Sequence, residues 1–276
     1  MRVRLTILCE NTVARPNGAI GEHGFSCFIE TGAGNFLFDT GNGAGLLHNA
    51  TVLGADLASV RAIILSHGHF DHCGGLRDAL TRIGGAEVVA HPGIFRPRYW
   101  QGQFEKRANG LPFQQAELEA VGARFSFRRE FCALAPGLYY SGEIPRVTPF
   151  ETGDPHLVIA DDSGGYCHDP FDDDAFVAVE SGQGLVVLLG CAHAGVVNSL
   201  RHAAARTERP IHAIVGGTHL APAGDSQFTG TVAALREFGV SKLAVSHCTG
   251  LPRSAQLSIE FPGRFVFASV GTALDF

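Results

Sequence analysis

The sequence Ser66-His67-Gly68-His69-Phe70-Asp71-His72-Cys73-Gly74-Gly75 decides how the rest of the chain is interpreted. Three of its histidines and its one aspartate lie between positions 67 and 72, directly after the apolar run from Ala62 to Leu65. A short apolar run of this kind predicts a buried strand. A strand that ends in such a cluster brings several metal-binding atoms to one point. We therefore expect His67, His69, Asp71 and His72 to be metal ligands.

Composition indicates a folded globular protein and argues against a nucleic acid partner. A chain of 276 residues with 45% hydrophobic and 17% charged residues can bury a large core and is not disordered. The net charge of −6 and the lack of a lysine and arginine cluster able to cradle a phosphate backbone argue against a nucleic acid partner. No apolar stretch approaches the roughly 18 residues of a membrane span, and the N-terminus predicts a strand rather than a signal peptide. The seven cysteines form no CxxC pair, so we expect a reduced, cytoplasmic protein.

Other apolar runs along the chain also stop at a histidine. They end at His91, His193, His219 and His247. Because ligands bind at the carboxyl ends of strands in α/β layers, we expect these ends to meet around one metal site. His193 and His247, followed by His219, are the stronger candidate ligands. His91, together with His23, is expected in the substrate pocket or behind the ligands.

The order of predicted elements indicates an α/β fold. Each half of the chain has hairpin strands followed by alternating strands and helices. The stretch from 93 to 150 breaks this rhythm and is rich in aromatic and basic residues, which predicts a lid insertion. The acidic segment from Asp161 to Asp174 lacks the spacing of a calcium loop, and we expect a solvated turn there.

The stretch from Ser66 to Gly75 resembles the HxHxDH signature of the metallo-β-lactamase superfamily. Phe36-Leu37-Phe38-Asp39-Thr40-Gly41, Gly190-Cys191-Ala192-His193-Ala194-Gly195 and Ser246-His247 resemble its other motifs. This resemblance implies a four-layer αββα sandwich, formed by one domain over residues 1–276 with the lid at about 93–150. It also implies that Asp39 orients the metal ligands from behind.

A narrower resemblance is to the branch that contains the dihydropterin-linked ribofuranosylaminobenzene phosphate synthases. It is carried by Ser141-Gly142-Glu143-Ile144-Pro145-Arg146, Gly216-Gly217-Thr218-His219-Leu220 and His247-Cys248-Thr249-Gly250. Most of the superfamily has a glycine and a bridging aspartate where this chain has Gly217-Thr218-His219.

The resemblance implies a ligand set for one or two ions. His67, His69 and His193 would bind the first ion, and Asp71, His72 and His247 the second, with His219 in place of the bridging carboxylate. Imidazole and carboxylate ligands suit zinc, and manganese or iron also fit. Because histidines fill the ligand positions, Cys73, Cys191 and Cys248 are expected to be small buried apolar residues.

The expected activity is hydrolysis by a metal-bound water or hydroxide, with Asp71 as a proton acceptor. Arg96 and Arg146, beside the aromatic residues of the lid and with His23 and His91, suggest a pocket for a small anionic substrate, phosphorylated or pterin-like. Two alternatives remain open. One is a transferase that joins a pterin to an arylamine, and the other is a metal-dependent binding protein without catalysis. The sequence does not specify the oligomeric state.

Overall fold

Two seven-stranded sheets pack face to face in the computed structural model, which describes residues 2–161 and 163–276. In spatial order the first sheet contains β18 (Ala273–Asp275), β1 (Val3–Cys9), β2 (Ser26–Thr31), β3 (Gly34–Phe38), β4 (Val60–Ile64), β5 (Ala86–Ala90) and β8 (Ala123–Phe127). The second contains β17 (Phe265–Phe267), β16 (Lys242–Ser246), β15 (Ile211–Gly217), β14 (Gly184–Leu189), β13 (Phe176–Ser181), β10 (Leu138–Tyr140) and β9 (Cys132–Ala135).

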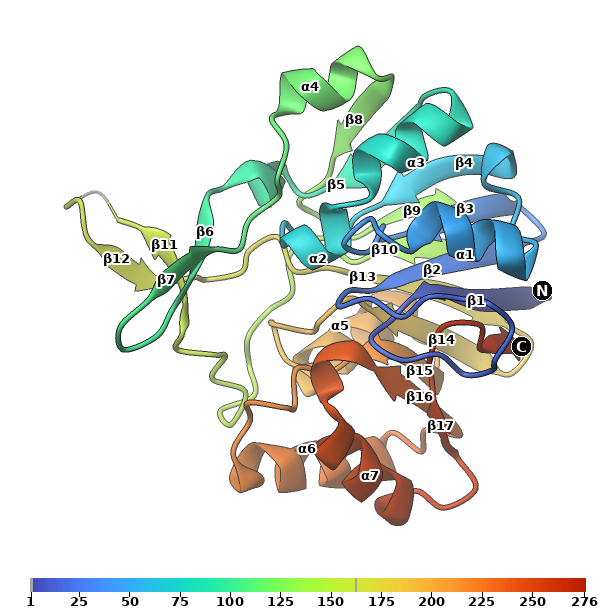
Figure 1. Cartoon of the computed structure of the whole chain (residues 1–276). Coiled ribbons are helices and arrows are strands. Elements are labelled where there is room, and N and C mark those ends of the chain that lie inside the picture. Colours follow the sequence, from blue (N-terminus) through green and yellow to red (C-terminus); the bar gives the residue numbers. More distant parts are fainter. Residues whose placement is uncertain (1, 162) are drawn as a thin grey trace.

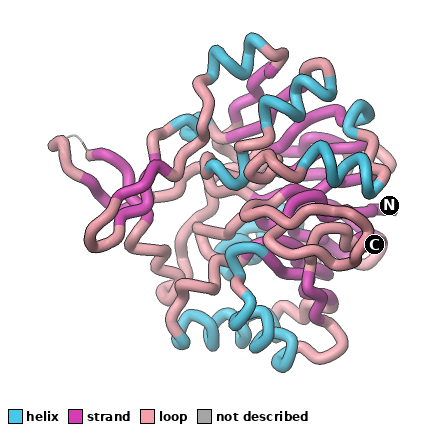
Figure 2. The backbone as a smooth tube through the Cα atoms, in the orientation of Figure 1, coloured by secondary structure: helices cyan, strands magenta, loops and turns pink. Residues whose placement is uncertain are grey.

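Helices cover the outer face of each sheet (Figure 1; Figure 2). On the first sheet they are α1 (Leu46–Leu53), α3 (Leu76–Ile83) and α4 (Gln115–Ala120), with α2 (Phe70–Cys73) at the edge and short 3₁₀ turns η1 (Leu57–Ser59) and η2 (Pro92–Phe95). On the second they are α5 (Val196–Thr207), α6 (Asp225–Glu237) and α7 (Leu251–Glu260), with the 3₁₀ turn η3 (His247–Thr249). The predicted four layers are confirmed.

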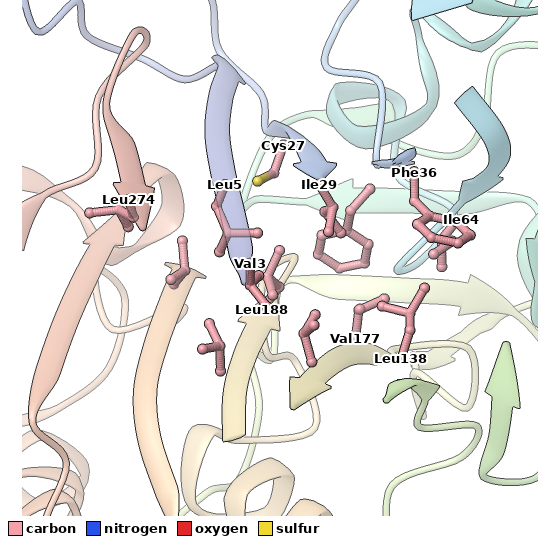
Figure 3. Packing of buried hydrophobic residues seen from close by; sticks show 14 of the residues in the cluster. Val3, Leu5, Cys27, Ile29, Phe36, Ile64, Leu138, Val177, Leu188 and Leu274 are labelled. Carbon is pink, nitrogen blue, oxygen red and sulfur yellow. The ribbon is translucent and has the colours of Figure 1, made fainter. Parts of the chain in front are cut away.

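The main core lies between the two sheets (Figure 3). Leu5 and Ile64 of the first sheet and Val177 and Leu188 of the second are fully buried there. The strands bury residues on both faces, because helices pack on the opposite side of each sheet and form two further apolar clusters. The long apolar runs in the sequence reflect this double burial.

Parallel strands set the position of the functional residues. β3, β4, β5 and β8 run parallel in the first sheet, and β14, β15, β16 and β17 run parallel in the second. The carboxyl ends of parallel neighbours lie at the same edge of a sheet. The loops that follow β4, β14, β15 and β16 therefore meet at one rim.

The predicted lid differs from the observed insertion. A third sheet, here called the outer sheet, contains β12 (Tyr166–His168), β11 (Leu157–Ala160), β6 (Arg98–Gln101) and β7 (Lys106–Ala108) in that order. It projects to one side in Figure 1. Residues 123–140, which were expected within the lid at 93–150, instead extend both main sheets as β8, β9 and β10. β11 pairs with its neighbour in sequence, β12, and with β6, which is distant in sequence, so the aromatic stretch alone did not reveal this sheet.

The acidic segment from Asp161 to Asp174 is not simply a solvated turn, and Asp162 lies outside the described residues. Asp169, Asp173 and Asp174 are buried. Buried carboxylates need partners, and Arg98 supplies one by donating to Asp169 and Asp173 at 2.6 Å each.

In the part of the chain that the structure describes, no helix has the length and apolar character of a membrane span.

Candidate metal centre

The first half of the centre follows β4. His67 and His69 lie in the extended turn after this strand, and the distance from His67 Nε2 to His69 Nδ1 is 3.0 Å. One turn of helix, α2, then presents Asp71 and His72. All four side chains are buried, as expected for groups at the junction of two sheets.

The second half supplies three histidines from the ends of three neighbouring strands. His193 follows β14, and its ring centroid lies 4.8 Å from that of His67 and 4.9 Å from that of His69. His247 follows β16, and its Nε2 lies 3.2 Å from His72 Nε2 and 3.3 Å from Asp71 Oδ2. The predicted convergence of strand ends brings these six side chains together.

His219 lies beside His193 and two cysteines, and not in the group with Asp71, His72 and His247 that the resemblance implied. Its ring centroid is 4.3 Å from that of His193, and its metal-binding atoms group with Cys191 and Cys248 rather than with Asp71, His72 and His247. The nearest carboxylate oxygen, Asp154 Oδ2, is 3.6 Å from His219 Nε2. His219 thus extends the row of histidines beyond His193.

Several buried ring nitrogens in this centre have no hydrogen-bond partner among the described residues. They are His69 Nε2 and both ring nitrogens of His193. Buried polar atoms in folded proteins are nearly always paired, because an unpaired one costs free energy. His67, His69 and His193 each offer a donor atom within 4.8 Å of the others. These atoms fit a cation held by three imidazoles.

At His67, His69, His193 and Asp71 the electrostatics of the centre favour the protonation states that bind metals. At His72, burial lowers the pKa, but the Asp39 and Asp71 carboxylates outweigh burial and raise the pKa to about 9. Burial lowers the pKa of His67, His69 and His193 well below the usual value, which keeps these imidazoles neutral. Burial alone would raise the pKa of Asp71, but the charge of His72 and hydrogen bonds from His23 and His247 hold it well below the usual value. Asp71 is therefore a carboxylate.

Asp39 lies behind His72, as the resemblance implied. Its Oδ2 lies 2.7 Å from His72 Nδ1, and its Oδ1 accepts from the Ser66 backbone N–H at 2.7 Å. The carboxylate fixes the ring so that Nε2 faces the centre. Asp39 has φ 55°, a left-handed conformation that is uncommon outside glycine, which is consistent with a functional constraint.

Glu10 and Asn11 support His247 in a similar way, although the sequence analysis did not name them. Glu10 Oε1 accepts from the His247 backbone N–H at 2.8 Å, and Asn11 Oδ1 lies 2.9 Å from His247 Nδ1. Both residues follow β1. The same signal that indicated the histidines, polar residues directly after an apolar strand, could have identified them.

Phe171 and Arg98 support the other side, and neither role was predicted. The Phe171 ring stacks on His193 at a centroid distance of 4.1 Å and an angle of 11°. The Arg98 guanidinium lies 5.7 Å from the Phe171 ring centroid, and its partner Asp173 also accepts from the Gly68 backbone N–H at 2.8 Å. A Cβ at Gly68 would lie 2.2 Å from the Ile94 carbonyl oxygen, so this position between His67 and His69 requires glycine.

A cavity of about 540 Å³ opens beside the centre. The predicted pocket residue His23 lines it and contacts Asp71, with 3.2 Å between His23 Nε2 and Asp71 Oδ2. The outer sheet and the loop after it contribute Trp100, Arg107 and Asn109. Arg107 lies over the Trp100 ring at 4.5 Å from its centroid.

The other predicted pocket residues do not line this cavity. His91 Nε2 is 3.0 Å from Glu143 Oε1, and Arg96 faces Asp172 at 3.8 Å. Arg146 donates to the backbone carbonyls of His193 and Pro170. Their partners lie on the loops that support the centre, so these three side chains stabilise loops rather than contact a ligand in this cavity. Nothing in their local sequence distinguishes the two roles.

Comparisons with known proteins agree with this geometry. The family model described as the metallo-beta-lactamase superfamily matches residues 20–237. The 7,8-dihydropterin-6-methyl-4-(beta-D-ribofuranosyl)-aminobenzene-5'-phosphate synthase of Methanocaldococcus jannaschii is 28% identical, with 99% of this chain and 97% of the synthase covered. An uncharacterized protein of the same organism is 26% identical, with 97% and 98% covered. The crystal structure of Tm1679, described as a metal-dependent hydrolase of the beta-lactamase superfamily, has a TM-score of 0.84, 28% identity and 99% coverage of both chains.

Proposed function

Because this chain belongs to the metallo-beta-lactamase superfamily, we propose that it is a metal-dependent hydrolase of a small anionic molecule. The observation that carries the proposal is the convergence of buried, unpaired imidazole nitrogens with the Asp71 carboxylate at the wall of a cavity. The full-length similarity to Tm1679, a protein described as a metal-dependent hydrolase, also supports it. A small molecule, rather than a nucleic acid or a membrane surface, is the proposed partner, since the net charge is −6.

Two sets of residues would hold the metal. His67, His69 and His193 would bind one ion, and Asp71, His72 and His247 would bind a second. Neutral imidazoles with one carboxylate suit zinc, and manganese or iron would also fit these donors. A bound ion of this kind supplies a Lewis acid and lowers the pKa of a water molecule from about 15.7 to about 7.

The protein's own groups would bind the substrate and move the proton. Asp71 Oδ2 contacts both His247 and His23, and the side chain of His23 is 62% exposed. A proton accepted by Asp71 would therefore have a direct route through His23 to solvent. Asp39, Glu10 and Phe171 would hold the imidazoles in place during this transfer.

Trp100 and Arg107 indicate the class of substrate. The Trp100 ring offers an aromatic surface at the cavity, and the Arg107 guanidinium above it offers a cation. A planar ring with a phosphate or carboxylate group would stack on the first and pair with the second. Phosphate esters, lactones and thioesters that carry such a ring are the candidates.

Transfer is the second candidate function. The similarity to the dihydropterin-linked synthase extends over almost the whole of both chains. The same donors and cavity would then accept an arylamine and a pterin that carries a leaving group such as a phosphate ester. The amine nitrogen rather than water would attack the carbon that bears this group, so that a C–N bond forms as the bond to the leaving group breaks. A pterin ring is planar, so it would stack on the Trp100 ring as well as the ring of a hydrolase substrate would.

One experiment separates these functions. Purified protein would be analysed for bound metal and then assayed against panels of phosphoesters, lactones and thioesters, and against an arylamine with a pterin that carries a phosphate-ester leaving group. We expect bound metal and turnover of at least one ester panel. Condensation of pterin and amine without ester hydrolysis would favour the transferase. Bound metal with no turnover in any panel would contradict both proposals and favour a metal-dependent binding protein.

A further inference from the structure

The turns after β14, β15 and β16 carry a second cluster of donors beside the histidine–aspartate centre. Cys191, His219 and Cys248 each offer one atom, and these three atoms lie within 4.8 Å of one another. The three strands are parallel neighbours, so their carboxyl ends place one residue from each turn at the same point. Two sulfur atoms and one imidazole nitrogen are a ligand set that zinc proteins use.

Hydrogen bonding within the protein does not account for this cluster. Both ring nitrogens of His219 are buried and have no hydrogen-bond partner among the described residues. The Cys248 sulfur receives the His219 backbone N–H at 3.2 Å, an interaction that leaves the imidazole unused. The closest carboxylate contact of this ring is Asp154 Oδ2, which lies 3.6 Å from Nε2, beyond hydrogen-bond distance. Two buried ring nitrogens without a hydrogen bond, beside two thiols, point to an additional ligand.

The backbone around the cluster is held in uncommon conformations. Ala192, His219 and His247 have φ values of 57°, 49° and 54°, in the left-handed region that non-glycine residues rarely adopt. Each is a cluster residue or the direct neighbour of one. A Cβ at Gly217 would lie 2.7 Å from the Cys248 sulfur and 2.3 Å from the Gly190 carbonyl oxygen. The close approach of β15 to this sulfur therefore requires glycine.

We propose that Cys191, Cys248 and His219 bind one thiophilic divalent ion, separate from the histidine–aspartate centre. The three residues also line the cavity of about 540 Å³, so a fourth coordination position would face the cavity. Three protein ligands and one open position are typical of an ion that contacts substrate rather than a closed structural site. Thiolate ligands favour zinc, cadmium or cobalt over magnesium, calcium or manganese. The proposal does not depend on hydrolysis, because ligation can be observed directly.

The position of Cys191 allows a competing explanation, in which its sulfur belongs to the histidine–aspartate centre. The Cys191 sulfur lies 3.1 Å from His72 Nε2 and also groups with His67 and His72. Cys191 alone could therefore belong to the histidine–aspartate centre. Cys248 and His219 have no place in that grouping, so they decide between the two arrangements.

Cobalt substitution tests the proposal in the full chain. After removal of metal with a chelator, Co²⁺ would be added and the near-ultraviolet thiolate-to-cobalt charge-transfer absorption measured, with bound cobalt counted per chain. We expect this absorption in the wild-type protein, about half of it in Cys191→Ser and in Cys248→Ser, and none in the double variant. His219→Gln should weaken cobalt binding at this site and lower the absorption at limiting cobalt. His69→Ala, which disrupts only the histidine centre, should retain the absorption.

A cysteine outside the cluster provides the control. Cys167→Ser, which changes an exposed thiol on β12, should leave the spectrum unchanged. Circular dichroism would verify the fold of each variant, and Cys248→Ala would replace Cys248→Ser if serine disturbs it. No charge-transfer absorption in the cobalt-loaded wild-type protein would overturn the proposal. Loss of the absorption in Cys191→Ser or His69→Ala with full retention in Cys248→Ser would also overturn it, because the sulfur would then belong to the histidine centre.

Discussion

The rim of strand ends and the outer sheet are held in place by different interactions. At the rim, buried apolar strands of two sheets end together, and hydrogen bonds from Asp39 and Glu10 orient the rings. In the outer sheet the residues of β7 are exposed, and the strand is held by its pairing with β6 and by cation–π contacts such as Arg107 over Trp100. The large core thus fixes the position of the reacting groups. The groups that would meet the substrate are attached through few contacts, so they can change without loss of the centre.

Arg98 is the main connection between these two regions. It belongs to β6 of the outer sheet, yet it is buried and pairs with Asp169 and Asp173, and Asp173 holds Gly68 of the histidine turn. Variants at the rim should therefore change metal binding. Variants of Arg98 should change stability, and variants in the outer sheet should change substrate affinity.

The largest effect is expected at the rim. His193→Ala should lower metal affinity by more than the roughly 100-fold that loss of an outer hydrogen-bond partner costs, and turnover should fall with it. Metal content per chain and the turnover rate would be measured together. His48→Ala is the control, since His48 is exposed and contacts the Gly18 carbonyl oxygen. Unchanged metal content in His193→Ala would contradict the assignment of this ligand.

The second-largest effect is expected on stability, when Arg98, which connects the two regions, is replaced. Arg98→Met would leave two buried carboxylates without their cation, and we expect the free energy of unfolding to fall by about 3–5 kcal/mol. Denaturant titration would measure it. Arg96→Met removes a partly exposed pair at 3.8 Å and should cost less than about 1 kcal/mol. Equal losses in the two variants would mean that Arg98 does not connect the regions.

The third effect is expected at Asp39, which would orient His72 without binding the metal itself. Asp39→Asn keeps the size of the side chain, and asparagine tolerates the left-handed backbone, but it weakens the hold on His72 Nδ1. Metal affinity should decrease about 10- to 100-fold with little change in secondary structure. Competition with a chromogenic chelator would measure the affinity. An affinity equal to that of the wild-type protein would contradict the role of Asp39.

The smallest effect is expected in the outer sheet. Trp100→Ala should raise KM about tenfold, equivalent to about 1.4 kcal/mol, while kcat and metal content stay unchanged. Lys106→Ala is the matched control on the neighbouring strand, since Lys106 packs on Tyr166 and does not line the cavity. A fall in kcat or in bound metal in Trp100→Ala would show that the two regions are not separable.

The rim could be predicted from sequence because each of its residues directly follows a recognisable buried strand. His67, His193 and His247 needed only the rule that parallel strands end at one edge. His219 follows the same rule, but the rule does not specify which neighbours its ring meets, and the ring lies beside His193, Cys191 and Cys248. The pairing of Arg98 with Asp169 and Asp173 spans some 70 residues and has no local signal. The same holds for β6 and β11, which is why the boundaries of the lid were misplaced.

The most direct test of the proposed function is turnover measured in one preparation before chelation, after chelation and after metal is restored. The substrate would be the most active member of the ester panels. We predict that turnover disappears when the bound ions are removed and returns when zinc is added, in proportion to the ions bound per chain. Full turnover after complete removal of metal would contradict the proposal that the histidine–aspartate centre catalyses the reaction.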